Sequence, residues 1–171
     1  RPPTPAHARP RPPTPAHARP RPPAAHPQAH WELCRHSCVP YGLGWGETIC
    51  AAGNDQMVAF YDKEGMQLQR FDYSHDESEK EFTTAAFNPS GETVVVGSFN
   101  RFRTFTLNQH DSSWNDQGAK QVDNMYTVTA LAWKCDGSRL TCGSLCGAVD
   151  MYDASGGSVA QEDQVARPPR C

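Results

Sequence analysis

Long hydrophobic runs are missing from this sequence. Its apolar stretches are only a few residues long, as in Val94-Val95-Val96, whereas a membrane-spanning helix needs about 20 apolar residues. We therefore expect no membrane span and no secretory signal peptide, which needs a hydrophobic core segment. The seven cysteines are odd in number and irregularly spaced. They do not resemble a disulfide framework, and they favour a reducing compartment such as the cytosol.

Acidic residues are missing from the first 30 positions, which hold five arginines. Residues 31–171 therefore carry 11 of the 16 Lys and Arg residues against all 19 Asp and Glu residues, a formal charge of −8. A mildly acidic region lacks the basic surface that binds phosphate backbones. Nucleic acid is not an expected partner.

Residues 1–30 consist of a ten-residue unit, RPPTPAHARP, which is repeated once without change and then imperfectly. Eleven of the 15 prolines lie there. Such a segment cannot bury enough apolar surface to offset the entropy of ordering, which predicts an extended, disordered chain. A basic proline-rich arm can dock on aromatic grooves; the alternatives are a linker and translated repetitive DNA.

Residues 31–153 have a different pattern. Aromatic and β-branched residues alternate with turn signals there, and no apolar stripe with the 3.6-residue period of a helix runs for long. This pattern predicts an all-β fold. Residues 154–171 are polar and contain glycine and proline, so we expect a disordered tail.

Three segments of the β region repeat one order of features: a first strand, a tight turn, a buried strand and a third strand. They cover residues 40–62, 82–106 and 127–153. The first strand of each ends on an aromatic residue, namely Trp45, Phe87 and Trp133. The buried strand reaches a glycine, namely Gly53, Gly97 and Gly143.

The spacing of these residues predicts a WD40 β-propeller. The aromatic residues lie 42 and 46 positions apart, and the glycines 44 and 46. A period in the forties with four strands per unit is typical of that fold. Tyr61-Asp62 and Tyr152-Asp153 stand where a Trp-Asp pair is usual. We expect blades at about residues 38–72, 82–124 and 126–153, with fourth strands at Met66–Phe71 and within Trp114–Asn124.

Two and a half to three blades are fewer than the four or more of a closed ring. The sequence therefore predicts part of a propeller whose end blades have open faces and unpaired edges. We expect the chain to aggregate or to form a molten state when it is expressed alone.

The cysteines offer a candidate zinc site. Cys142 and Cys146 have the spacing of zinc ligands, and Cys34 and Cys38, with His36 between them, could supply a second pair. The repeat instead places Cys142 on an inner strand and Cys146 in a turn, where cysteine packs as a small apolar residue. The sequence therefore predicts no metal site and no cofactor.

Other catalytic patterns are also absent. The glycines at 42, 44 and 46 lack the spacing of a phosphate-binding loop, and no helix follows them. No local motif supports a Cys–His nucleophile, and the Ser and His residues form no recognisable triad. We expect a protein that is not an enzyme, has no catalytic residues and takes no small-molecule substrate.

Two charged stretches are candidate contacts for protein partners. The acidic segment Tyr73–Glu81 joins two blades, and loops on a rigid scaffold often bind partners. An ordinary solvated connector is the simpler interpretation. Arg101 and Arg103 flank Phe102, and they either cover a blade edge or meet the acids of a partner.

Five stretches, in this order, resemble the later blades of the first propeller in the intraflagellar transport protein 172 family: PYGLGW, FDYS, EFTTA, GSFNRFRTF and YTVTALAWKCDGSRLTCGSLCG. The resemblance covers about Cys38 to Asp153. It implies a non-catalytic scaffold in a long subunit of intraflagellar transport complex B. It also implies other intraflagellar transport subunits as partners, a role in ciliary transport and cilium assembly, and a location in the cytoplasm and the cilium or flagellum.

Two other functions remain open. A propeller of another coat or trafficking scaffold would share the same architecture, and fold alone does not separate the two. The stretch LAWKCDGSRLTCGSLCG favours the intraflagellar transport family. A metal or thiol protein built on the cysteines is the third hypothesis, and metal analysis would distinguish it.

Overall fold

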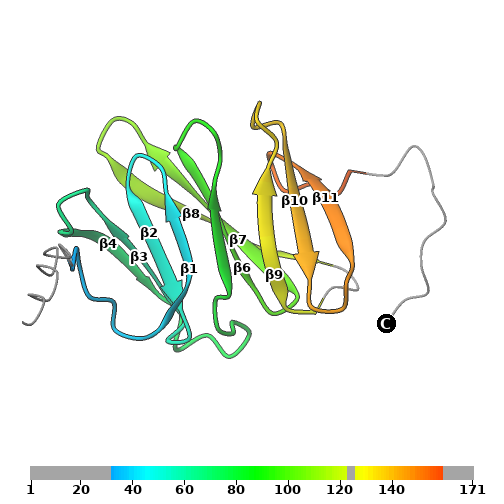
Figure 1. The fold of residues 1–171 in the computed structure, drawn as a ribbon, viewed down its shortest axis with the longest axis horizontal. Coiled ribbons are helices and arrows are strands. Elements are labelled where there is room, and N and C mark those ends of the chain that lie inside the picture. Colours follow the sequence, from blue (N-terminus) through cyan, green and yellow to red (C-terminus); the bar gives the residue numbers. More distant parts are fainter. Residues whose placement is uncertain (1–31, 123–125, 160–171) are drawn as a thin grey trace, which may run out of the picture. The chain divides into compact units, whose positions relative to one another are not determined.

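The computed structural model describes residues 32–122 and 126–159 of the 171-residue chain. Every regular element in these ranges is a β-strand (Figure 1), which confirms the predicted all-β class. Within the same ranges, nothing forms a helix of the length and apolarity that a membrane crossing requires. The disorder predicted for residues 1–30 concerns a segment outside the described residues, as does that predicted for residues 160–171.

The strands of the described residues form three antiparallel sheets, in each of which strands that follow one another in sequence are paired. The first sheet contains β1 (Pro40–Trp45), β2 (Ile49–Gly53), β3 (Met57–Tyr61) and β4 (Gln67–Asp72). The second contains β5 (Thr84–Phe87), β6 (Thr93–Ser98), β7 (Arg101–Asn108) and β8 (Ser113–Gln121). The third contains β9 (Val128–Trp133), β10 (Arg139–Ser144) and β11 (Val149–Asp153).

The sheets pack side by side through their first strands. β1 packs on β5, and β5 packs on β9. Figure 1 shows the three sheets following one another in this order. Each first strand ends on its predicted aromatic residue, and the two predicted fourth strands are present as β4 and β8. This succession of meanders with adjacent inner strands is the arrangement of propeller blades.

The pairing of the strands shows which residues of the three sheets are equivalent. Ile49 pairs with Tyr61, Val94 with Phe105, and Leu140 with Tyr152. By this register Ala52 is equivalent to Gly97 and Gly143, whereas Gly53 takes the position of Ser98 and Ser144. The glycine alignment predicted for the first sheet is therefore wrong by one residue, because its glycine stands at the last position of the strand.

Each sheet has a leading face, directed toward the preceding sheet, and a trailing face, directed toward the following one. Buried residues of the first sheet's trailing face share one core with the second sheet's leading face. A second core joins the second sheet's trailing face to the third sheet's leading face. Both faces of β6 lie in these cores, so it is buried along almost its whole length. The second face of β2 is covered by Leu33 and Cys34 of the segment before β1.

Aspartates of the Tyr-Asp pairs shape the turns after the third strands. Oδ1 of Asp62 accepts hydrogen bonds from the backbone N–H groups two and four residues later, at 3.0 and 2.7 Å. Asp153 repeats this arrangement at 2.9 and 2.7 Å. A short acceptor side chain that holds its own turn is a common reason for aspartate at such positions.

The turn after Asp153 changes one expectation. The sequence places residues 154–159 in a disordered tail, yet Ser158 forms an isolated antiparallel bridge with Tyr152. The Val159 N–H also donates to the Met151 carbonyl at 3.0 Å. These residues begin a third pairing in this sheet, because the turn held by Asp153 returns the chain alongside β11.

Candidate functional site

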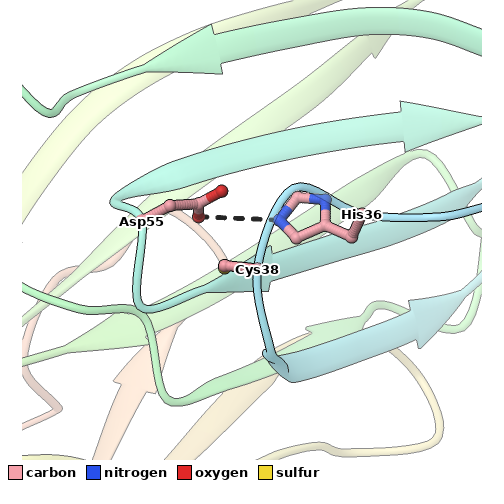
Figure 2. Close-up of side chains that lie close together, drawn as sticks. All are labelled: His36, Cys38 and Asp55. Carbon is pink, nitrogen blue, oxygen red and sulfur yellow. Dashed lines mark ion pairs between the residues drawn. The ribbon is translucent and has the colours of Figure 1, made fainter.

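Three side chains with metal-binding atoms meet beside the first sheet: His36, Cys38 and Asp55 (Figure 2). His36 and Cys38 lie in the segment before β1, and Asp55 lies in the turn between β2 and β3. Their ligand atoms all lie within 4.8 Å of one another, and His36 Nε2 is 3.6 Å from Asp55 Oδ1.

The second ring nitrogen of His36, Nδ1, also has a partner. Its Nδ1 is 3.2 Å from the hydroxyl of Tyr61, the tyrosine of a Tyr-Asp pair. The side chain is only 5% exposed, and Nε2 is buried without a hydrogen bond within the described residues. If Nδ1 donates to Tyr61, the Nε2 lone pair is directed at Cys38 and Asp55, which is the tautomer of a metal ligand.

Asp55 already has several partners. Its carboxylate accepts hydrogen bonds from the backbone N–H of Met57 at 3.2 Å and from the Ser37 hydroxyl. Burial raises the pKa of Asp55, but these bonds, together with Cys38 and the nearby His36, outweigh it and lower the pKa below its usual value. Burial and the Asp55 carboxylate raise the pKa of the Cys38 thiol, so the thiol is neutral near pH 7.

This arrangement has two chemical capacities. A zinc ion takes nitrogen, sulfur and carboxylate ligands, and a tetrahedral site would place its N and O ligands about 3.4 Å apart, close to the observed 3.6 Å. Zinc binds cysteine as the thiolate, so binding here would release the proton of the Cys38 thiol. Without an ion, the His36–Asp55 pair and the Tyr61 contact fasten the segment before β1 to the first sheet. The absence of a metal site remains a prediction.

The two cysteine pairs of the zinc hypothesis lie on different sheets. Cys142 is buried in β10, where burial raises the pKa of its thiol to about 12. The Cys146 sulfur lies 3.1 Å from the Ser144 hydroxyl in the turn after β10. Cys38, by contrast, groups with Asp55. The sequence contained a clue to this grouping, since His-x-Cys precedes the first strand and an aspartate follows the second.

The acidic connector between the first and second sheets is partly a core element. Glu79 has a fully buried side chain, and its Oε2 lies 2.7 Å from Arg103 Nη2. Arg103 also pairs with Asp116 at 2.6 Å and stacks on the Tyr73 ring, 4.1 Å from its centroid. The acids that meet Arg103 therefore belong to this chain.

A patch of exposed apolar residues lies where the second and third sheets meet. Phe99 and Thr127 form an isolated bridge there and line two shallow hollows. Tyr126, Leu145 and Cys146 complete one hollow, and Lys80, Glu81 and Thr83 complete the other. Phe99, Tyr126 and Leu145 are exposed, and we refer to these three residues as the rim patch.

Curated relatives of this chain from several organisms are forms of intraflagellar transport protein 172. No protein-family model matches the chain. Intraflagellar transport protein 172 of Chlamydomonas reinhardtii is 57% identical over 123 residues, which are 72% of this chain and 7% of that protein. The Homo sapiens homologue is 50% identical over 123 residues, which are 71% of this chain and 7% of that protein. The chain thus spans a small part of the curated relatives it matches.

The fold also matches a solved structure. Sqt1 of Chaetomium thermophilum, a WD40 protein, superposes with a TM-score of 0.61 at 17% identity, covering 72% of this chain and 35% of that one. This likeness confirms the predicted partial WD40 propeller. Over the 123 matched residues, this chain corresponds to a propeller segment of intraflagellar transport protein 172.

Proposed function

We propose that this chain is a non-catalytic WD40 scaffold element of ciliary transport, which contacts other intraflagellar transport subunits in the cytoplasm and the cilium or flagellum. The proposal rests on one observation: the curated relatives of this chain in Chlamydomonas, human and mouse are the same protein, intraflagellar transport protein 172. Loops held by a rigid set of sheets are suited to binding other proteins. Among the described residues we recognise no nucleophile with a neighbouring base, the arrangement that covalent catalysis needs.

The rim patch is the surface that we assign to such contacts. Aromatic side chains exposed together are enriched in protein interfaces, and Phe99 and Tyr126 supply them here. The acidic connector contributes less, because Glu79 is used inside the chain and Asp76 accepts hydrogen bonds from Ser78.

The test is affinity purification of the tagged full chain from ciliated cells, together with microscopy of the same tag. We expect other subunits of intraflagellar transport complex B to co-purify and the tag to enter cilia. Leu145→Ser should reduce the recovered subunits several-fold, because it removes an exposed apolar contact. Met66→Ser, an equally exposed residue in the β3–β4 turn, is the matched control.

The alternatives give different results in the same preparation. Recovery of vesicle-coat subunits in place of complex B would support a different trafficking scaffold. Stoichiometric zinc in the purified chain that disappears in Cys38→Ser would support a metal protein. Either result would contradict the proposed function.

A further inference from the structure

An aspartate and the serine two positions after it form the same hydrogen bond in five turns of the described residues. In each turn the serine hydroxyl donates to the aspartate Oδ1 at 2.6 or 2.7 Å. The pairs are Asp72–Ser74, Asp76–Ser78, Asp111–Ser113, Asp136–Ser138 and Asp153–Ser155. Ser78 differs from the other four serines, as the structure describes them, since its Oγ also accepts a hydrogen bond from Arg101 Nη1 at 3.3 Å.

The charge of Arg101 is not neutralised within the described part of the chain. Arg101 and Arg103 lie two positions apart on β7, so their side chains are on the same face of that strand. Arg103 pairs with Glu79 and Asp116. Arg101, by contrast, forms no ion pair with any residue that the structure describes, and its buried Nε lacks a hydrogen-bond partner there. A positive charge with unused donors is therefore available beside the Ser78 hydroxyl.

The surroundings of Ser78 match the substrates of acid-directed serine kinases. Ser78 is exposed and lies in the acidic connector between β4 and β5, and exposed loops are the parts of a folded chain that other enzymes reach most easily. Exposed carboxylates stand one position before it, at Glu77, and three positions after it, at Glu81. Acids that flank a serine are the charge pattern that a kinase with a basic substrate groove selects. The hydroxyl is therefore accessible to such an enzyme and adjacent to a cation.

We propose that Ser78 is a phosphorylation site whose phosphate is held by Arg101. In the modification, Oγ of Ser78 attacks the γ-phosphorus of ATP, the bond to the departing ADP breaks, and the hydroxyl proton passes to the carboxylate base of the kinase. The phosphoserine carries a charge of about −1.5 to −2 at pH 7 and has three further acceptor oxygens. These oxygens accept charge-assisted hydrogen bonds from the Arg101 guanidinium, which now contacts only a neutral hydroxyl.

The modification exchanges one contact of the acidic connector for another. Ser78 loses the proton that it donates to Asp76 Oδ1, and the phosphate repels that carboxylate. Arg101 lies on β7 of the second sheet, so its ion pair with the phosphate joins the connector to that sheet. Every group in this exchange belongs to the chain itself, so the site does not depend on which partners the chain binds.

Treatment of the purified full chain with ATP, Mg²⁺ and casein kinase II, an acid-directed serine kinase, tests the site. We expect mass spectrometry to place phosphate on Ser78. Glu81→Gln should slow this phosphorylation several-fold, because it removes the acid three positions after the serine. Glu64→Gln changes an equally exposed acid in the β3–β4 turn, and this control should leave the rate unchanged.

Phosphorus NMR of the modified chain tests the role of Arg101. The second ionisation of phosphoserine has its midpoint at about pH 6, and a neighbouring guanidinium lowers that midpoint. Arg101→Gln should therefore raise the midpoint of the Ser78 phosphate by about one pH unit. Arg139→Gln, which removes an exposed charge from β10 in the third sheet, should leave it unchanged. Ser78→Ala identifies the signal by its loss.

Ser74 supplies an internal comparison in the same samples. It has the same bond to an aspartate and an acid three positions later, at Glu77, so the same kinase can modify it. Arg101→Gln should leave the midpoint of a Ser74 phosphate unchanged, and circular dichroism shows whether each variant retains its β-structure. The proposal is overturned if the kinase leaves Ser78 unmodified, or if the Ser78 phosphate titrates alike in the wild-type chain and in Arg101→Gln.

Discussion

The two junctions between sheets use equivalent positions but different residues. The first junction is rich in aromatic rings: Phe60 stacks on Trp114 with centroids 4.4 Å apart and also contacts Phe71 and Phe105. The second junction has mainly aliphatic residues, with one aromatic pair, Phe102 and Tyr152, at 5.1 Å.

The buried charged groups also lie at the first junction. The buried Arg103–Glu79 pair lies beside Tyr73, whose ring packs on the core of the first junction. The pairing of strands is therefore the same from sheet to sheet, whereas the side chains that stabilise each junction between sheets differ. We expect the first and second sheets to form the more stable unit and the third sheet to detach first.

The largest expected effect tests this difference directly. Phe60→Ala should lower the free energy of unfolding by about 4–5 kcal/mol, because it leaves a cavity and removes three ring contacts. Phe102→Ala should cost about 3 kcal/mol, since only one ring contact is lost. Denaturant unfolding at fixed protein concentration measures both. Equal losses would contradict the proposed division.

Removing the buried charge partner should have the next largest effect. Glu79→Gln leaves Arg103 buried with Asp116 as its remaining carboxylate, and we expect a loss of about 3 kcal/mol. Asp76→Asn, in the same connector but exposed, should leave the free energy of unfolding nearly unchanged. A small loss in Glu79→Gln would mean that Asp116 alone neutralises Arg103.

Two equivalent glycines offer a smaller and cleaner comparison. Gly97→Ala should destabilise the chain by about 1–3 kcal/mol, because the new methyl group meets Val128 across the second junction. Gly143→Ala should change stability by less than about 0.5 kcal/mol, since its space is open. Both variants are compared by thermal melting at a concentration too low for association. Similar melting temperatures would show that the side chains at the second junction shift to accommodate the new methyl group.

The smallest expected effect concerns pH and the segment before β1. Because the pKa of Asp55 is lowered in the folded chain, its contribution to stability is present above the unfolded pKa of about 3.9 and is lost as pH falls through the folded value. Asp55→Asn should therefore be less stable than wild type near pH 6, and the two should converge at acid pH. A constant difference across this range would exclude the ionised carboxylate as the cause.

Much of the fold followed from the sequence because strands and turns leave local patterns. The strand-ending aromatics, the tight turns after them and the Tyr-Asp pairs of the first and third sheets predicted the strands. Gly137 has the positive φ of 71° that its turn requires. The one-residue error at Gly53 arose because a glycine fits either of the last two positions of a strand, and only the pairing of β2 with β3 decides between them.

The candidate site was less predictable. The grouping of His36 with Asp55 depends on where a segment without regular structure lies against the first sheet, and the His-x-Cys pattern with its following aspartate does not fix that position. Arg103 was recognised as a candidate for pairing with acids, but the burial of Glu79 inside an acidic connector was not. A charged run indicates solvent exposure on average, and one member of it can still face the core.

The local pairing within each sheet has a kinetic consequence. Every strand pairs with its neighbour in sequence, so each sheet can form through short-range hairpin closure. Assembly of one sheet on the next then proceeds along the chain as in repeat proteins, where each unit contacts only its neighbours. Translation delivers the sheets in the order in which they stack, so we expect each newly made sheet to pack on the one before it as it emerges.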